Sequence, residues 1–208
     1  MRARLPADWD RDLAGRHGIE HDVARSIDGH AGFRLVANNT ASMTEPDYTV
    51  VDDRGRTLAV ELKTRRQTPG PSWRTARPDT DPQDLFVLDE LTVRKLVPHA
   101  PHAYLLVADL AGPCTRWIAF SIGDLIVIDR TRISRPLNTG RTGRPSEKGK
   151  WLIDLSDAPA IEDTLDGLLD QLSLLTRTVD VCWPHIGLWP TTPSRTNPNR
   201  TPPPGVAA

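Results

Sequence analysis

The sequence has little of what marks several specialised classes of protein. Its 208 residues include two cysteines, Cys114 and Cys182, which are far apart and form no CxxC pair. This disfavours a disulfide framework or a cysteine-ligated metal site. No stretch resembles a signal peptide or is long and apolar enough to span a membrane, so we expect a cytoplasmic protein. The six histidines show no HxH or HExxH grouping, and no GxGxxG or GxxxxGK motif is present, which gives no support to nucleotide hydrolysis.

Excess charge is also lacking, since the formal net charge is −1. Binding to nucleic acid would therefore have to rest on local basic patches. Two polar segments, residues 65–83 and 130–150, are rich in arginine and lysine. We expect both to be flexible loops that could face phosphates. The plain alternative is that they are solvated loops without a partner.

Proline, in contrast, is abundant, with 19 residues that crowd into two places. One of these is the end of the chain, where Pro, Thr, Asn and Arg dominate from Trp189 onward. Such a composition offers little apolar surface to bury. We therefore expect one domain over residues 1–180 and a disordered proline-rich tail over residues 181–208.

The remaining pattern predicts a mixture of helices and strands. Residues 7–29 are predicted to form one helix, or two short ones broken at Gly15–Gly18. Residues 103–110 form a near-continuous apolar run, typical of a strand buried on both faces. Further strands are expected at 33–37, 117–120 and 151–155, and further helices at 89–98 and 161–175, with 125–128 ambiguous between a strand and a helix end.

A hairpin organises the rest of the chain. Two runs with strand character, residues 48–51 and 57–62, flank Asp-Asp-Arg-Gly, where glycine supplies a positive φ. Because side chains alternate along a strand, Glu61 and Lys63 should share one face and Val60 and Leu62 the other. The hairpin should also bring Asp47 close to Glu61 and Lys63. Two carboxylates and a lysine at one place suit a hard divalent cation beside a phosphate.

This constellation has a structural alternative. Acidic and basic side chains on a solvated strand face can form a cross-strand ion pair worth about 0.2–1 kcal/mol. The spacing of the three residues, the hairpin between them and the helix before them together favour the functional interpretation.

The same residues resemble a known family of nucleases. Pro46-Asp47 is similar to the PD element, and Glu61-Leu62-Lys63 to the ExK element, of the PD-(D/E)xK nuclease superfamily. Residues 18–24, with Glu20, resemble the first helix of many members, and Gln67 follows the lysine as a polar residue does in several branches. The resemblance covers residues 18–67. It implies the restriction-endonuclease-like fold, which is an α/β fold with a mixed β-sheet flanked by helices.

The resemblance also implies an activity and a cofactor. The chain would be a metal-dependent endonuclease that hydrolyses phosphodiesters with Mg²⁺, or Mn²⁺, bound by Asp47, Glu61, the backbone carbonyl of Leu62 and Glu20. Lys63 would orient the attacking water and neutralise the phosphate, and Glu20 would support catalysis. For Glu20 there is a simpler reading, because a glutamate in a first helical turn interacts favourably with the helix dipole.

Nucleic acid is the expected partner, with DNA favoured over RNA although no base-reading motif is present. A repair, restriction or mobile-element role stays open, as does a homodimer or a partner protein that supplies specificity. The rival interpretation is a non-catalytic module on the same scaffold that binds nucleic acid or protein. The candidate contacts lie in the two basic segments: Arg65, Arg66, Gln67, Trp73, Lys148 and Lys150.

Overall fold

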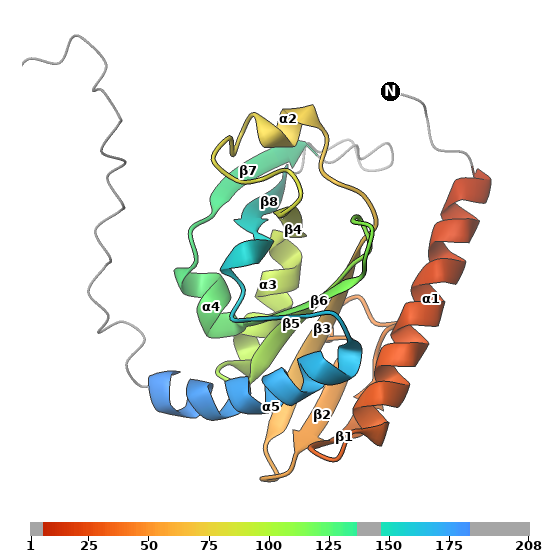
Figure 1. Cartoon of the computed structure of the whole chain (residues 1–208), viewed down its shortest axis with the longest axis vertical. Coiled ribbons are helices and arrows are strands. Elements are labelled where there is room, and N and C mark those ends of the chain that lie inside the picture. Colours follow the sequence, from red (N-terminus) through yellow and green to blue (C-terminus); the bar gives the residue numbers. More distant parts are fainter. Residues whose placement is uncertain (1–5, 137–146, 184–208) are drawn as a thin grey trace, which may run out of the picture.

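The computed structural model describes residues 6–136 and 147–183. The described chain is a mixed α/β structure with two β-sheets flanked by helices, as the sequence predicted (Figure 1). Within it, no helix is both long and apolar enough to cross a membrane. Most of the expected tail, from residue 184 onward, lies outside the described residues.

The larger sheet has six strands in the order β1-β2-β3-β5-β6-β9. All neighbouring strands are antiparallel except β3 and β5, which are parallel, so the sheet is mixed. β5 is buried along its whole length, as the apolar run predicted. The strands are β1 (Phe33–Asn38), β2 (Tyr48–Asp52), β3 (Thr57–Arg65), β5 (Ala103–Asp109), β6 (Arg116–Ser121) and β9 (Ala160–Glu162).

The smaller sheet is antiparallel, in the order β4-β8-β7. It corrects one expectation, because much of the second basic segment is strand rather than loop. Its strands are β4 (Leu85–Asp89), β7 (Thr131–Pro136) and β8 (Glu147–Asp154).

Three of the helices, α3, α4 and α5, begin at residues whose side chains cap them. Asp89 accepts a hydrogen bond from the Leu91 N–H at the start of α3, and Thr164 accepts one from the Gly167 N–H at the start of α5. Ser121 and Asp124 cap α4 reciprocally, which resolves the ambiguous segment 125–128 as mainly helix. The helices are α1 (Pro6–Gly29), α2 (Pro71–Arg74), α3 (Glu90–Leu96), α4 (Ile122–Val127) and α5 (Leu165–Cys182), with 3₁₀ turns at Val97–His99 and Leu155–Asp157.

The first predicted helix forms as one piece rather than two, and the last differs from its expected bounds. α1 is continuous through Gly15 and Gly18. A glycine costs only about 1 kcal/mol in a helix interior, which is not enough to end a helix that is supported elsewhere. α5 begins after Ile161, which pairs with β6 as part of β9 instead.

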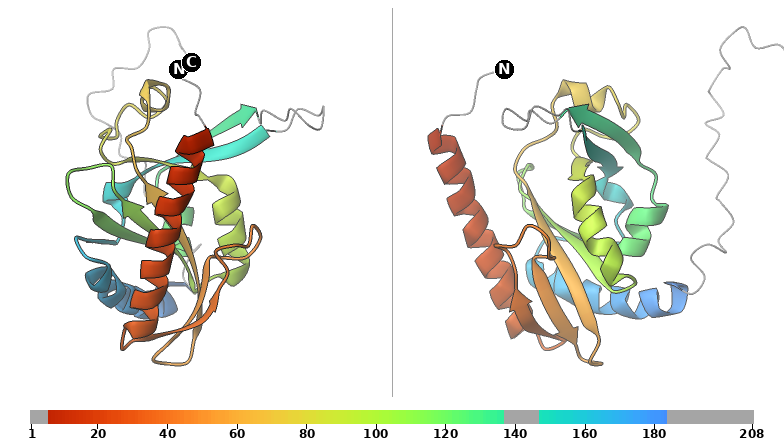
Figure 2. Two further views of the ribbon diagram at one scale, coloured as in Figure 1. Left: turned by 90° about the vertical axis from the view of Figure 1, so that its right-hand side faces the viewer. Right: turned by 180° about the vertical axis from the view of Figure 1, so that it is seen from behind.

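The two faces of the larger sheet carry separate cores. Val60 and Leu62 belong to the core beneath α1 and α5, and Ala59 belongs to the core shared with α3, α4 and the smaller sheet. Figure 2 shows the same division, with α1 and α3 on different sides of the strands. Glu61 and Lys63, which alternate with Val60 and Leu62, therefore face the side that α3 covers.

Candidate active site

The hairpin forms as predicted and brings Asp47 to Glu61. Strands β2 and β3 pair with Tyr48 opposite Val60, and Gly55 in the turn has a φ of 78°. Continuing this register by one place puts Asp47 opposite Glu61, on the same face of the sheet. One carboxylate oxygen of Asp47, Oδ2, accepts a hydrogen bond of 2.9 Å from the backbone N–H of Leu62. The carboxyl of Asp47 is thereby fixed against the strand that carries Glu61.

Glu61 is almost wholly buried, with 1% of its surface exposed. Its Oε1 accepts a hydrogen bond of 2.5 Å from Lys63 Nζ. Its Oε2 lies 2.7 Å from Lys95 Nζ, but this contact lacks hydrogen-bond alignment, so Oε2 is buried without a hydrogen bond. The structure therefore brings together Asp47, Glu61 and Lys63 and adds Lys95.

Lys95 was missed by the sequence analysis. It lies on α3, more than thirty residues after Glu61. A lysine in a short helix with no surrounding motif does not by itself indicate a functional site. It could have been found only by recognising that α3 must cover the Glu61 face of β3. The helix buries Thr92, Val93 and Leu96, and Lys95 itself is only 15% exposed.

The carboxyl of Asp47 has a raised pKa. Burial is the largest cause, and the negative charge of Glu61 adds to it, while Lys63, the Leu62 N–H and Lys95 act in the opposite direction. A divalent cation between the two carboxylates would relieve both their desolvation and their repulsion. The unsatisfied Oε2 of Glu61 offers such a cation a hard oxygen ligand.

Few of the described side chains near Asp47 and Glu61 could serve as metal ligands. Within the described residues, no three acidic, histidine or cysteine side chains gather in a group able to hold a metal ion. Asp47 and Glu61 fit Mg²⁺ as two carboxylate ligands, because Mg²⁺ usually retains several waters and binds one or two carboxylates plus substrate phosphates. The carbonyl of Leu62 as a further ligand stays a prediction.

Glu20 is buried on α1, the helix that covers the opposite face of the sheet. Its backbone carbonyl accepts a hydrogen bond of 2.8 Å from the hydroxyl of Tyr48, the residue after Asp47. This contact joins α1 to the start of β2 directly beside the candidate site. The structure does not bring the Glu20 carboxylate into a three-carboxylate group with Asp47 and Glu61, so its role in metal binding stays a prediction.

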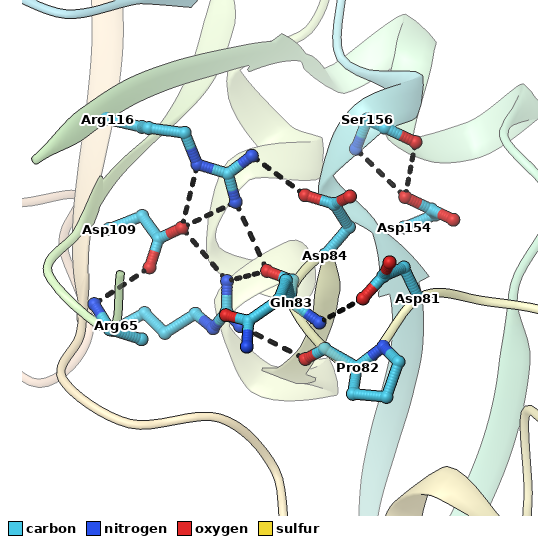
Figure 3. A network of polar contacts seen from close by, with 10 residues as sticks. Arg65, Asp81, Pro82, Gln83, Asp84, Asp109, Arg116, Asp154 and Ser156 are labelled. Carbon is cyan, nitrogen blue, oxygen red and sulfur yellow. Dashed lines mark hydrogen bonds and ion pairs between the residues drawn. The ribbon is translucent and has the colours of Figure 1, made fainter. Parts of the chain in front are cut away.

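Arg65 does not occupy the position expected of a nucleic-acid contact. It is 4% exposed, and its guanidinium donates to Asp109 Oδ2 at 2.9 Å and to the carbonyls of Gln83 and Pro82 (Figure 3). Arg116 donates to the same carboxylate and to Asp84. The guanidinium of Arg65 thus joins the larger sheet to the segment before β4, which corrects the expectation for this residue.

The other five residues expected to contact nucleic acid differ in how exposed they are and in whether they are already paired. Arg66 and Gln67 are exposed directly after β3, and Trp73 is half-buried on α2. Lys148 and Lys150 both form ion pairs with Asp89 Oδ2, that of Lys150 at 3.1 Å. Part of the positive charge on β8 is therefore neutralised within the protein. Contact of these five residues with nucleic acid stays a prediction.

Comparisons with known proteins assign no family. No protein-family model and no curated protein matches the chain. Among solved structures, the fold is similar to that of D212, described as a nuclease from a fusselovirus, with a TM-score of 0.38 and 10% sequence identity. The match covers 86% of this chain and 98% of D212. This likeness is too distant to assign a function.

Proposed function

We propose that the protein is a metal-dependent nuclease that hydrolyses phosphodiester bonds of nucleic acid, with DNA as the favoured substrate. One observation carries the proposal: the hairpin places the carboxylates of Asp47 and Glu61 and the ammonium of Lys63 together. The PD-(D/E)xK pattern in the sequence requires this same juxtaposition. Residues that the pattern names are adjacent in space although fourteen positions separate Asp47 from Glu61 in the chain.

In this proposal the carboxylates of Asp47 and Glu61 hold Mg²⁺. When bound, the ion supplies positive charge that stabilises the negative charge developing on the phosphate. Lys63 Nζ donates hydrogen bonds, orients the attacking water and neutralises a phosphate oxygen. The reaction forms a bond between the water oxygen and phosphorus and breaks the bond from phosphorus to the leaving sugar oxygen. The attacking water gives up a proton to solvent, and the leaving oxygen takes one up from solvent.

The presence of two adjacent carboxylates supports catalysis over binding alone. A surface that only binds nucleic acid gains affinity from positive charge facing phosphates. Asp47 and Glu61 instead cancel the positive charge of Lys63 and Lys95, which weakens the attraction of this place for a phosphate. The two adjacent carboxylates of Asp47 and Glu61 therefore favour a site that works with a metal ion over one that only binds phosphate.

The test is a cleavage assay with plasmid, single-stranded DNA and RNA, with and without Mg²⁺ or Mn²⁺. We expect metal-dependent cleavage by the native protein and a loss of about 100-fold or more in Glu61→Gln, which keeps the shape but removes a charged ligand. The matched control is Glu162→Gln on β9, at the edge of the same sheet, which should cleave normally. Equal cleavage by the native protein and Glu61→Gln, or absence of any metal-dependent cleavage, would reject the proposal.

A further inference from the structure

The charges around Glu61 balance before any metal is present. Asp47 and Glu61 contribute two carboxylates, and Lys63 and Lys95 contribute two ammonium groups. Each oxygen of Glu61 lies against one of the lysines, Oε1 against Lys63 and Oε2 against Lys95. A divalent cation that binds Glu61 would therefore compete with the two lysines for these oxygens.

The two lysines hold Glu61 differently. Lys63 forms a short hydrogen bond to Oε1 from the same face of the same strand. Lys95 reaches Oε2 from a helix, and its contact is close but not aligned as a hydrogen bond. Since a charged contact without alignment gains less than a charge-assisted hydrogen bond, Oε2 is the oxygen more easily transferred to a cation.

The helix that carries Lys95 is itself held in place independently of this contact. At its N-terminus, Asp89 pairs with Lys148 and Lys150 of β8, and Glu90 pairs with Arg132 of β7. Glu90 also lies so close to Gly149 that any side chain at position 149 would collide with it. Lys95 can therefore leave Oε2 without α3 losing its attachment to the smaller sheet.

We propose that Lys95 is a positioning residue that occupies the metal-facing oxygen of Glu61 in the metal-free protein and sets the affinity for the metal. This inference rests on the proposed function, because it concerns the same site. While the site lacks a metal, the ammonium of Lys95 neutralises the buried carboxylate. When a divalent cation binds, it takes Oε2 and Lys95 moves away from Glu61.

Metal affinity tests this inference without reference to cleavage. Binding of Mn²⁺ alone is measured at pH 8 by the loss of the free-ion electron paramagnetic resonance signal. We expect Lys95→Met to bind Mn²⁺ about tenfold more tightly than the native protein, because a competing positive charge is removed. Lys95→Arg, which keeps the charge, should return the affinity towards the native value. The control, Arg94→Met, removes a cation from the same helix that pairs with Glu90 instead, and should bind as the native protein does.

The reactivity of Lys95 gives a second readout that needs no variant. The native protein is acetylated briefly with and without saturating Mg²⁺, and the peptide that contains Lys95 is quantified by mass spectrometry. We expect Mg²⁺ to increase acetylation of Lys95 several-fold, because the ammonium leaves its ion pair and becomes accessible. A lysine that only stabilised the fold would react equally in both conditions.

The outcomes separate this inference from the proposed function. If the native protein, Lys95→Met and Lys95→Arg all fail to bind Mn²⁺, both fail. If the native protein binds Mn²⁺, Glu61→Gln does not, and Lys95→Met binds no more tightly than native with unchanged acetylation, the proposed metal site stands and the role of Lys95 is rejected. Tighter binding by Lys95→Met together with metal-dependent acetylation of Lys95 supports both.

Discussion

Two charged clusters lie next to each other along β3 and differ in how completely their carboxylates are satisfied. Glu61, Lys63 and Arg65 occupy alternate positions of the strand and so point to the same face. At Arg65, two guanidinium groups, from Arg65 and Arg116, share the Asp109 carboxylate (Figure 3). This carboxylate also accepts a hydrogen bond from the Ala111 N–H. At Glu61, one buried oxygen has no hydrogen bond, and neighbouring Asp47 has a raised pKa.

The difference shows how a structural ion network can be distinguished from a candidate site on the same strand. Burial alone does not separate them, since Asp109 and Asp47 are both 2% exposed. Arginine provides several fixed donors and can satisfy a carboxylate and backbone carbonyls at once, whereas lysine offers a compact charge that exchanges partners more easily. Both oxygens of Asp109 accept hydrogen bonds within the protein, although Arg65 Nε is itself buried without a partner, whereas Oε2 of Glu61 has an ion pair with Lys95 but no hydrogen bond.

The largest expected effect is a loss of stability when the ion network around Arg65 and Asp109 is broken. Arg65→Met removes a buried partner of Asp109 and a donor to the Pro82 and Gln83 carbonyls, of which the Gln83 carbonyl keeps a hydrogen bond from Arg116. We expect a loss of about 3 kcal/mol in the free energy of unfolding, at the low end for a broken buried pair because Arg116 still contacts Asp109. Urea denaturation measures it, with Arg66→Met, at the exposed next residue, as the control. A loss below about 1 kcal/mol would show that the network is not structural.

A smaller effect, a gain in stability rather than a loss, is expected for a substitution of Asp47 beside Glu61. The raised pKa of Asp47 means that its ionised form is less favourable in the folded protein than in the unfolded chain. The native protein should therefore lose stability as pH rises from 3.8, the ordinary value, through the raised folded pKa, and retain this penalty at higher pH. Asp47→Asn, which can still accept from the Leu62 N–H, should be more stable than the native protein at pH 8.

Thermal unfolding without metal at a series of pH values checks this prediction. The advantage of Asp47→Asn should shrink as pH falls through the raised pKa and vanish below the ordinary one. Saturating Mg²⁺ should raise the melting temperature of the native protein but not of Asp47→Asn, since binding to the folded state alone stabilises it. An advantage of Asp47→Asn that is independent of pH would contradict the assignment.

The smallest effect sharpens the contrast between adjacent arginines. Arg66 is exposed where Arg65 is buried, so only Arg66 is positioned for a phosphate. Arg66→Ala should weaken binding of nucleic acid similarly for all sequences and lower the slope of log affinity against log salt by about 1. Fluorescence anisotropy with a labelled duplex at several salt concentrations measures the slope. An unchanged slope would remove Arg66 from the binding surface.

Much of the fold near the site was predictable because its signals are local. The Asp-Asp-Arg-Gly turn with its two flanking runs predicted β2 and β3, and the apolar run at residues 103–110 predicted β5. The same locality brought Asp47, Glu61 and Lys63 together, since a hairpin fixes which residues face each other.

The errors concern contacts between distant elements. Arg65 and Arg66 are equivalent by composition, and only the packing of Asp109 and residues 82–84 against β3 separates them. Lys95 depends on the placement of α3 over β3. The charges of the second basic segment predict a solvated loop, whereas in the structure Lys148 and Lys150 are held on β8 by Asp89.

The interior position of β3 in the larger sheet limits the insertions and deletions that this strand can tolerate. The strand is paired on both edges, antiparallel to β2 and parallel to β5. A slip of a single residue would turn Val60 and Leu62 towards α3 and push Glu61 and Lys63 into the apolar layer beneath α1 and α5. Insertions or deletions within β3 should therefore yield insoluble chains rather than folded chains with an altered site, so that evolution can change this site by substitution but not by changing the length of the strand.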